Sequence, residues 1–355
     1  MSSYNVIGTM SGTSLDGLDI AYCSFELINN SWSFSINVAT TISFSIQLQK
    51  KLATSTKLSG LDLMKLNNEL GNFIGDAVSN FIKSNNIIHT KIDCIASHGH
   101  TVFHQPEINL TTQIGNGANI SSITKLPVVC DFRSTDVAIG GQGAPLVPIG
   151  DKNLFAAFDY CINLGGIANI SYTKNTKRIA FDICPVNIVL NKLSLELNLP
   201  YDKNGEVAQS GETNNALLEE LNKLNYYKKT PPKSLGIEQI EGTIFPIINN
   251  YQISTKDKLR TFVEHISIQI SNTITSENKK VLLTGGGTFN SFLAERIKVN
   301  TNNNIIIPSK EIIDFKEALI FGFLGVLRLR NEVNCLKSVT GASADNIGGC
   351  IYQAF

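Results

Sequence analysis

A segment near the N-terminus combines glycines with hydroxyl and carboxylate side chains, and it reads Gly8-Thr9-Met10-Ser11-Gly12-Thr13-Ser14-Leu15-Asp16-Gly17-Leu18-Asp19. Its glycines permit tight turns and a close approach of the backbone to a ligand, and successive backbone N–H groups in such a turn form an anion-binding nest. Asp16 and Asp19 could hold Mg²⁺ directly or through water, as phosphoryl transfer requires. The segment therefore indicates a phosphate site, while a plain glycine-rich hairpin with aspartate turns would have the same composition.

A second glycine run, Gly285-Gly286-Gly287, follows the apolar segment 281–284. Glycine at the carboxyl end of a strand opens a crevice in which ligands bind in open α/β sheets. This run would suit the sugar or α-phosphate of a nucleotide, and it would equally suit a strand-to-helix turn that needs small residues. The chain contains neither a G-x-x-x-x-G-K-[ST] loop nor the lysine and H-R-D set of protein kinases, so a nucleotide site would be a β-hairpin cradle.

Asp182 stands in the segment Phe181-Asp182-Ile183-Cys184-Pro185-Val186-Asn187, which follows a second small-residue hairpin. A carboxylate at the end of a strand is well placed to act as a general base. A single aspartate in a loop can also be a helix cap or a turn residue. Cys184 is close in sequence but has no neighbouring histidine, so a thiolate nucleophile has little support.

Three of the five histidines, His98, His100 and His104, lie close together in the segment 97–104. Two histidines in H-x-H spacing can bind zinc, but no cysteine or glutamate at metal-ligand spacing completes a set. We therefore predict a polar loop in which His98 contacts a substrate, rather than a metal site.

Arg133 lies in the segment 131–136, ahead of a Gly-Gly-Gln-Gly-Ala-Pro run. Its planar guanidinium offers a fork for the oxygens of a substrate or a phosphate. The alternative is a buried ion pair of Arg133 with Asp131 or Asp136.

These segments stand among stretches whose periodicity predicts strands and helices. Apolar residues recur every three or four positions over 63–81, which predicts an amphipathic helix. Short apolar or alternating stretches predict strands at 4–9, 19–27, 92–97, 159–164, 167–173, 281–284 and 304–307. Strands that alternate with helices indicate an α/β protein, and the similarity of the two glycine hairpins suggests two related halves.

The composition is that of a globular enzyme with two domains. A chain of 355 residues exceeds one ordinary core, and 43% hydrophobic with 17% charged residues excludes bulk disorder. The 30 basic side chains balance 30 acidic ones, which leaves no electrostatic footprint for nucleic acid or an anionic membrane. No transmembrane run or secretory signal is visible, and the 7 cysteines contain no C-x-x-C, so we predict a cytoplasmic protein with reduced thiols.

Eight segments, in their order along the chain, resemble the anhydro-N-acetylmuramic acid kinase family. They are GTMSGTSLDGLD (8–19), ASHGHTVFH (96–104), DFRSTDVAIGGQGAPLVP (131–148), NLGGIANIS (163–171), FDICPVN (181–187), PPKSLG (231–236), LTGGGTFN (283–290) and KEALIFGFLG (316–325). The resemblance implies an α/β, two-domain actin-like ATPase (ribonuclease H-like) fold with mixed sheets flanked by helices. Residues 1–130 and 335–355 would form a phosphate-binding domain I, and residues 131–334 a domain II with the catalytic aspartate and the adenosine-side glycine loop.

The resemblance also implies a reaction and its ligands. ATP and Mg²⁺ would act with 1,6-anhydro-N-acetylmuramic acid, a sugar of bacterial cell-wall (peptidoglycan) recycling. Water would open the anhydro bridge at C1, and O6 would be phosphorylated to give N-acetylmuramic acid 6-phosphate. We expect a homodimer in the bacterial cytoplasm.

The resemblance implies a role for each of the following residues of this sequence. The family's ATP phosphate segment matches Gly12, Thr13, Ser14, Leu15, Asp16, Gly17, Leu18 and Asp19. Gly285, Gly286 and Gly287 would lie on the adenosine side, and Asp16 would hold Mg²⁺. Asp182 matches the catalytic aspartate, which would take a proton from the attacking water. Arg133 and Glu317 match sugar-side positions, to which His98 is added as a substrate contact.

The chain departs from the commoner family pattern D-x-G-P-G-N, because Cys184 and Val186 replace two glycines. Val186 tolerates a positive φ poorly, so we expect the loop to take a different backbone path. His100 stands where many members have glutamine. We expect Asp182 to have an ordinary pKa of about 4 and to be ionised at pH 7. Two other functions stay open: a related amino-sugar kinase with another acceptor, and a nucleotide-switched actin-like ATPase that has no small-molecule acceptor.

Overall fold

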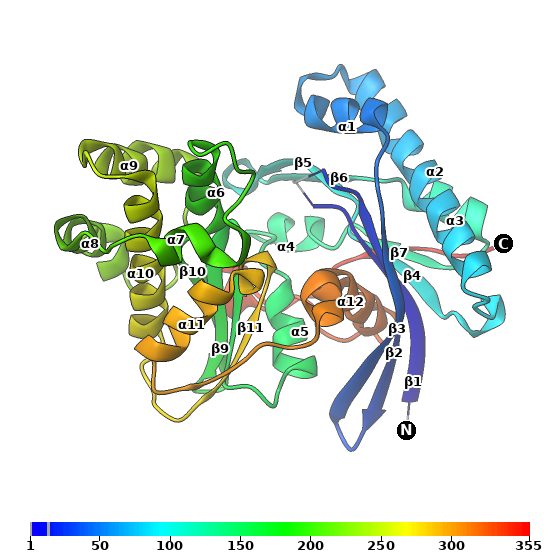
Figure 1. The fold of residues 1–355 in the computed structure, drawn as a ribbon. Coiled ribbons are helices and arrows are strands. Elements are labelled where there is room, and N and C mark those ends of the chain that lie inside the picture. The colour runs from blue at the N-terminus through cyan, green and yellow to red at the C-terminus, as the bar shows by residue number, and fades with distance from the viewer. Residues whose placement is uncertain (1, 13–14) are drawn as a thin grey trace. The chain divides into compact units, whose positions relative to one another are not determined.

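The computed structural model describes residues 2–12 and 15–355, and the chain divides into two compact units. The first unit contains residues 1–154 and 315–355, and the second contains residues 155–314. Each unit has its own sheet and its own hydrophobic core. Figure 1 traces the chain through the elements of both units.

The first unit is built on a six-stranded sheet with the order β13-β7-β4-β1-β2-β3. Its strands are β1 (Ser2–Met10), β2 (Leu18–Ile28), β3 (Ser31–Ile42), β4 (Cys94–Ser97), β7 (Val128–Cys130) and β13 (Cys350–Tyr352). The first three strands pair antiparallel, whereas β4 runs parallel to both β1 and β7. The last strand, β13, pairs antiparallel with β7 at the edge of the sheet.

The helices of the first unit are α1 (Ile46–Ala53), α2 (Gly60–Ser84), α3 (Gly117–Thr124), α4 (Ser134–Ala138), α5 (Val147–Leu154), most of α12 (Lys310–Leu329), and α13 (Lys337–Thr340). A separate two-stranded ribbon pairs β5 (His100–Gln105) with β6 (Leu110–Ile114). The predicted helix over 63–81 is confirmed as the middle of α2. Ser59 begins this helix, because its hydroxyl accepts a hydrogen bond from the backbone N–H of Asp62.

The second unit is built on a five-stranded sheet with the order β10-β9-β8-β11-β12. Its strands are β8 (Tyr160–Leu164), β9 (Ile167–Lys174), β10 (Lys177–Pro185), β11 (Lys280–Thr284) and β12 (Asn304–Ile306). Its helices are α6 (Asn187–Leu195), α7 (Glu206–Ser210), α8 (Asn215–Asn222), α9 (Ile237–Asn250), α10 (Thr255–Thr273) and α11 (Ser291–Asn300). Helix α10 contributes the fully buried side chains Phe262, Ile266 and Ile270 to the core.

The two units share one strand order. When the strands of each sheet are numbered along the chain, both sheets contain the order 3-2-1-4-5, and the first sheet adds β13 as a sixth strand. In both sheets strands 1, 2 and 3 pair antiparallel, and strands 1, 4 and 5 pair parallel. This repetition confirms the predicted α/β fold with mixed sheets flanked by helices, of the actin-like, ribonuclease H-like class, and it bears out the suggestion of two related halves.

The units divide the chain at other points than the predicted domains do. The predicted domain II covers residues 131–334, whereas the second compact unit covers residues 155–314. The physical reason is packing, because α4 contacts β6 and α5 contacts β3, both of which belong to the first unit. The segment after residue 314 likewise continues α12 against β1. The functional domain boundaries themselves stay a prediction.

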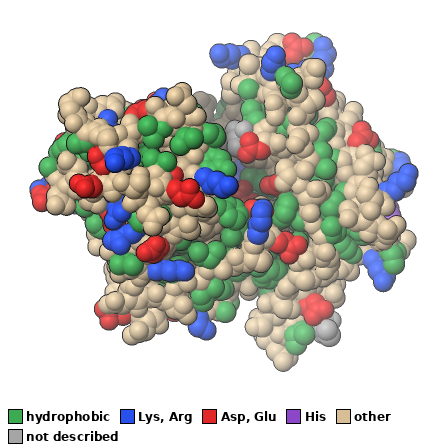
Figure 2. Space-filling model, in the orientation of Figure 1, with side chains coloured by type: hydrophobic (Ala, Val, Ile, Leu, Met, Phe, Trp, Pro, Cys, Tyr) green, Lys and Arg blue, Asp and Glu red, His purple; other side chains and the backbone are tan. Residues whose placement is uncertain are grey.

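The surface carries both signs of charge. Figure 2 shows basic and acidic side chains interspersed over the visible face, in agreement with a net charge of zero. Within residues 2–12 and 15–355, the helices are all too short or too polar to cross a bilayer.

Candidate active site

The predicted phosphate segment lies at the hairpin between β1 and β2. Thr13 and Ser14 lie outside the described residues. On either side of them, the Leu15 N–H donates to the Gly12 carbonyl (3.3 Å), and Leu15 has a φ of +60°. Gln49 of α1 donates its amide hydrogen to the Leu15 carbonyl (3.2 Å). The described part of the hairpin tip is thus held by the backbone and by one side chain of a neighbouring helix.

Gly17 and Leu18 fix the return of this hairpin into the sheet. A Cβ on Gly17 would lie 2.5 Å from the carbonyl oxygen of Ile42, so no other residue fits without a shift of the backbone. Leu18 is 1% exposed and anchors the start of β2 in the core. The glycine is therefore required by close backbone packing, whatever ligand the hairpin binds.

Two carboxylates follow the hairpin tip. Asp16 is exposed, and Asp19 is half-buried, with its Oδ1 accepting a hydrogen bond from the Thr41 hydroxyl (2.6 Å). The described residues contain no group of three histidine, cysteine or acidic side chains that could form an all-protein metal cage. One or two carboxylates beside a phosphate nest are nevertheless the donor set that suits Mg²⁺, which keeps water and phosphate oxygens as its other ligands.

Helix α12 brings Glu317 to the same sheet. The backbone of the helix lies directly against β1, because a Cβ on Gly8 would stand only 1.9 Å from the Ala318 carbonyl oxygen. Glu317 reaches solvent, yet desolvation by the surrounding protein raises the pKa of its carboxyl. Arg133 opposes this shift, and the negative charge of Asp19 adds to it. The sequence-predicted residues Asp19, Arg133 and Glu317 are thus electrostatic neighbours within the first unit.

Arg133 is held by His98. Its Nε and one terminal nitrogen donate to His98 Nε2 (3.1 and 2.9 Å), and its other terminal nitrogen donates to the Gly143 carbonyl (2.6 Å). His98 Nδ1 lies 3.0 Å from the Gly99 carbonyl, so this network assigns the proton to Nδ1 and leaves Nε2 as the acceptor. The alternative of an ion pair with Asp131 or Asp136 is wrong, since no such pair occurs among the described residues.

The charge states follow from this arrangement. Burial lowers the pKa of Arg133 to about 10, while Glu317 works in the opposite direction, so the guanidinium stays charged at pH 7. Burial, together with the positive charge of Arg133, holds the pKa of His98 well below its ordinary value. His98 is therefore a neutral, buried acceptor. Both of its ring nitrogens are engaged by protein groups, and its geometry is that of a residue that positions Arg133.

Asp136 fixes the glycine-rich loop, a role that the sequence analysis did not predict. Its side chain is fully buried and accepts four hydrogen bonds, from the Gly143 N–H (2.8 Å), the Cys335 thiol (3.0 Å), the Thr340 hydroxyl (2.9 Å) and the Asn346 amide (2.8 Å). It thereby ties the loop that holds Arg133 to the C-terminal segment. Three of these four partners lie about two hundred residues away in sequence, so no local pattern could have revealed this role.

Asp182 lies on β10, the edge strand of the second sheet. The pairing of β10 with β9 shifts by one residue at Ile183, which forms a bulge immediately after Asp182. Such bulges re-aim the adjacent side chains. The Leu235 N–H donates to Asp182 Oδ2 (2.9 Å), the Asp182 N–H donates to the Lys233 carbonyl (3.2 Å), and the Tyr226 hydroxyl donates to the Asp182 carbonyl (2.6 Å).

The expectation of an ordinary pKa for Asp182 is wrong. The carboxyl is half-buried, and desolvation raises its pKa, against the opposing effect of the hydrogen bond from Leu235. A raised pKa makes the carboxylate a stronger base than a solvated aspartate. No described residue donates to Oδ1, so that oxygen is the one available for a ligand or a water molecule.

The loop after Asp182 accommodates both glycine replacements. Val186 is fully buried and has a φ of −130° and a ψ of −96°, so its φ is negative, as a branched side chain prefers, while its ψ lies outside the helical and extended regions. Cys184 is also fully buried in the same core cluster. The Val186 N–H donates to the Gly166 carbonyl (2.8 Å), which ties the loop to the turn of the β8–β9 hairpin.

The second glycine run follows β11, as predicted. Gly285 has a φ of +85°, and a Cβ there would lie 2.5 Å from Asn163 Oδ1, so this position requires glycine. A Cβ on Gly287 would lie 2.8 Å from the Leu164 side chain, whereas Gly286 faces open space. The Gly286 backbone is therefore accessible to a ligand, and the other two glycines are explained by packing against β8.

The predicted site residues thus fall into local clusters. Within the first unit, Arg133 and Asp19 both act electrostatically on Glu317. Within the second unit, Asp182 is fixed by the segment 226–235, and Gly285–Gly287 stand at the end of β11.

Comparison with known proteins gives the family. A family model described as "Anhydro-N-acetylmuramic acid kinase" matches residues 4–354. A protein of Sulfurovum sp. (strain NBC37-1) with the same name is 34% identical, with 99% of this chain and 100% of the relative covered. A protein of that name from Hydrogenovibrio crunogenus is 32% identical over 98% of this chain and 97% of the relative.

Solved structures give weaker matches. The activator of the 2-hydroxyisocaproyl-CoA dehydratase from Clostridium difficile, solved with bound ADPNP, is 12% identical with a TM-score of 0.43, over 93% of this chain and 98% of that chain. Component A of the (R)-2-hydroxyglutaryl-CoA dehydratase from Acidaminococcus fermentans is 10% identical with a TM-score of 0.45, over 89% of this chain and 95% of that chain. The assignment rests on the sequence matches, which run almost from end to end: the chain belongs to the anhydro-N-acetylmuramic acid kinase family.

Proposed function

We propose that this protein is an ATP-dependent kinase that opens 1,6-anhydro-N-acetylmuramic acid with water and phosphorylates O6, in peptidoglycan recycling. The observation that carries the proposal is Asp182, a half-buried carboxylate with a raised pKa and one oxygen without a described partner. These are the properties of a general base. Membership of the family supplies the substrate.

The proposed reaction begins at the anomeric carbon. Asp182 takes a proton from a water molecule, whose oxygen forms a bond to C1 while the C1–O6 bond breaks. O6 leaves with the electron pair of that bond and attacks the γ-phosphorus of ATP, which releases ADP. Sugar opening and phosphoryl transfer are therefore linked through one oxygen atom.

Arg133 and Glu317 are proposed to hold the sugar. Arg133 keeps its charge, and His98 together with the Gly143 carbonyl restricts its rotation, so little rotamer freedom remains to be lost on binding. The raised pKa of Glu317 strengthens it as an acceptor for sugar hydroxyls. His98 is proposed to act through Arg133 rather than by direct contact with the substrate.

The nucleotide is proposed to bind at the β1–β2 hairpin and at Gly285–Gly287. Backbone N–H groups of the hairpin would hold phosphate oxygens, and the open face at Gly286 would approach the nucleoside. Asp16 and Asp19 would hold Mg²⁺ together with water. When bound, Mg²⁺ neutralises charge that develops on the phosphoryl oxygens. We further propose a homodimer that acts in the cytoplasm.

The product identifies the reaction. The protein would be incubated with ATP, Mg²⁺ and the anhydro sugar in H₂¹⁸O, and the product analysed by mass spectrometry with fragmentation. We expect a mass gain of one water and one phosphate group, with ¹⁸O at the C1 hydroxyl only. Label in released phosphate, without sugar turnover, would instead indicate an ATPase of the switch class. Phosphorylation of another amino sugar at a higher kcat/KM would show that the acceptor is wrong.

A further inference from the structure

A polar cavity lies in the second unit and is lined in part by the segment that fixes Asp182. It has a volume of about 260 Å³, and its lining includes Asn222, Tyr227, Lys233, Gln269, Asn272 and Thr273. These residues come from the end of α8, the turn 225–228, the segment after Pro231-Pro232, and the last turn of α10.

The charge of this cavity is positive. Lys233 and Lys228 both line it, and no acidic side chain does. Among the described residues, neither lysine pairs with a carboxylate. The Lys233 ammonium makes one long hydrogen bond, to the Tyr226 carbonyl (3.4 Å), and lies over the Tyr226 and Phe181 rings at 4.7 and 5.5 Å from their centroids. A half-buried cation with three N–H donors and so few partners is suited to an anion.

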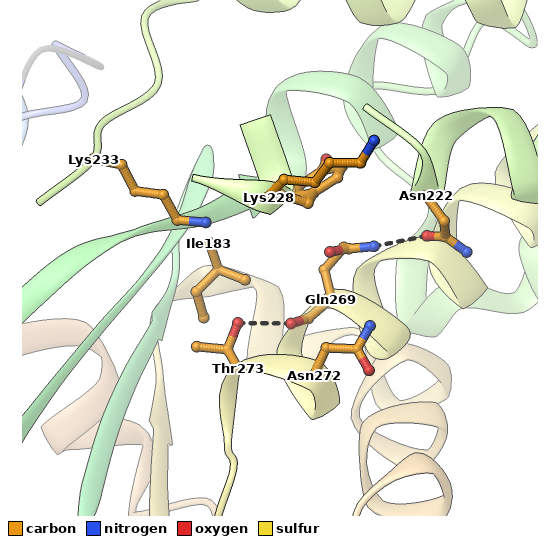
Figure 3. Close-up of a pocket in the computed structure, with 8 residues that line it drawn as sticks. Ile183, Asn222, Lys228, Lys233, Gln269, Asn272 and Thr273 are labelled. Atoms are coloured by element: carbon orange, nitrogen blue, oxygen red, sulfur yellow. Dashed lines mark hydrogen bonds between the residues drawn. The ribbon is translucent and has the colours of Figure 1, made fainter. Parts of the chain in front are cut away.

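The opposite wall consists of fixed amides. Gln269 is 5% exposed and donates from Nε2 to Asn222 Oδ1 (2.8 Å). Asn222 Oδ1 also lies 2.7 Å from His265 Nδ1, while the Tyr227 hydroxyl lies 2.8 Å from His265 Nε2. Figure 3 shows the Gln269 side-chain oxygen on the side of Lys233, with Lys233 extending toward Ile183. This wall therefore presents an acceptor, and its orientation is set before any ligand arrives.

We propose that this cavity binds a small anionic polyol, a sugar phosphate or a sugar acid, with Lys233 as the partner of its charged group. The amides of Gln269, Asn272 and Asn222 would form hydrogen bonds with its hydroxyls, because an amide offers both a donor and an acceptor and a hydroxyl can use both. An apolar ligand is excluded by the lining. A metal cation is excluded by the two ammonium groups.

The site touches the catalytic segment directly. The Lys233 carbonyl accepts from the Asp182 N–H (3.2 Å), and two residues further on Leu235 donates to Asp182 Oδ2 (2.9 Å). A ligand that fixes Lys233 therefore restrains the backbone that orients Asp182. This consequence rests on the proposed function, whereas ligand binding itself does not.

Calorimetry with four probes tests the binding. Glucose 6-phosphate and gluconate carry the two anionic groups, glucose is the neutral analogue, and inorganic phosphate lacks the polyol. We expect saturable binding of one or both polyol anions, at least tenfold tighter than that of glucose or phosphate. The better of the two anions identifies the charged group. The absence of saturable binding by either anion would overturn the proposal.

Three variants localise the binding. Lys233→Met removes the charge at similar volume, and Asn272→Asp places a negative charge at an exposed position of the wall. We expect each of these two substitutions to lower the affinity for the anion at least tenfold. Lys229→Met is the matched control, because Lys229 is an exposed lysine of the same segment that does not line the cavity. Equal binding by wild type and Asn272→Asp, with both proteins folded by circular dichroism, would place the anion elsewhere and contradict the proposal.

An activity measurement separates this inference from the proposed function. With the anhydro sugar and ATP, we expect the bound anion to change kcat by at least twofold in wild type and not in Asn272→Asp. If the anion binds but the sugar is not phosphorylated, the proposed function fails and the cavity assignment stands. If the sugar is phosphorylated and no anion binds, the cavity assignment fails and the proposed function stands.

Discussion

The carboxyl of Asp182 combines partial burial with a single hydrogen bond from Leu235, and burial dominates its pKa. A general base contributes roughly 10²–10⁴-fold to the rate. Asp182→Asn keeps the shape of the side chain but cannot take the proton of water. We therefore expect kcat to fall at least about a hundredfold, while the binding constants for ATP and the sugar change less than about tenfold, or 1.4 kcal/mol.

Single-turnover kinetics and calorimetry would measure the two effects separately. Ring opening and phosphorylation should be lost together, because O6 is freed only when the C1–O6 bond breaks. Sugar phosphorylation by the Asp182→Asn variant at near wild-type rate would remove this carboxyl from the mechanism and make Glu317 the next one to test.

His98 gives a second prediction at the residue scale. His98→Ala removes the shared acceptor of two Arg133 N–H groups and leaves a charged donor unsatisfied, which should cost about 1–3 kcal/mol of unfolding free energy. We expect the KM for the sugar to rise about tenfold, with kcat changed less, because Arg133 is proposed to bind the ground state as well as the transition state.

His98→Gln is the informative control for this variant, since its amide oxygen can accept again. Partial recovery of KM is expected. Equal KM values for wild type and His98→Ala, at equal stability, would show that Arg133 does not depend on this contact.

At the scale of elements, the packing of α12 on β1 depends on Gly8. A methyl group there would stand 1.9 Å from the Ala318 carbonyl, which is backbone and cannot turn aside. We expect Gly8→Ala to lower the unfolding free energy by about 2 kcal/mol or more, measured by urea titration. Gly60→Ala is the matched control in the same unit, because it has nothing within 4 Å of its Cβ and should be neutral or stabilising. Similar losses in both variants would contradict the close contact.

Helix α10 carries a histidine that makes stability depend on pH. Burial lowers the pKa of His265 to about 3, whereas its ordinary value is 6.5. Below pH 6.5 the unfolded chain takes up a proton there that the folded chain refuses, so stability is lost as the pH falls toward the folded pKa.

Urea titrations between about pH 6 and about pH 5 would measure this loss as a slope of up to about 1.4 kcal/mol per pH unit for each such proton. His265→Gln should reduce the slope, even if it also lowers stability overall. An unchanged slope would mean that His265 is protonated in the folded protein.

The elements differ in how far local sequence determines them. The helical stripe over 63–81 and the Ser59–Asp62 cap are local signals, so α2 could be predicted. The strand order could not be derived from periodicity, because pairing joins strands that are distant in sequence. Likewise, the His98–Arg133 contact joins residues 35 positions apart, and Asp136 is fixed by partners near the C-terminus. The raised pKa of Asp182 needed the burial of its carboxyl, which depends on the segment 226–235.

At the scale of the whole molecule, the two cores share no residue. We therefore expect the two units to unfold in separate steps rather than as one cooperative block. The single tryptophan allows a direct measurement, because Trp32 belongs to β3 of the first unit and packs against Phe323 at 5.1 Å between ring centroids.

Urea unfolding followed by tryptophan fluorescence would report the first unit, and far-ultraviolet circular dichroism would report both. We expect the two midpoints to differ. Coincident transitions would show that the molecule unfolds as one unit, despite its two cores.

The first unit is made of two stretches of chain, and the second unit is inserted between them. A ribosome synthesises the chain from its N-terminus, so the second unit is complete before most of α12 and all of β13 exist. The half that is begun first is finished last, the reverse of the usual order for a protein of two domains. Until α12 is synthesised, β1 lacks the helix that covers Gly8, and until β13 is synthesised, β7 has one edge without a partner. A nascent chain therefore holds an unfinished first sheet throughout the synthesis of the second unit, and removal of β13 would leave that edge of β7 open permanently.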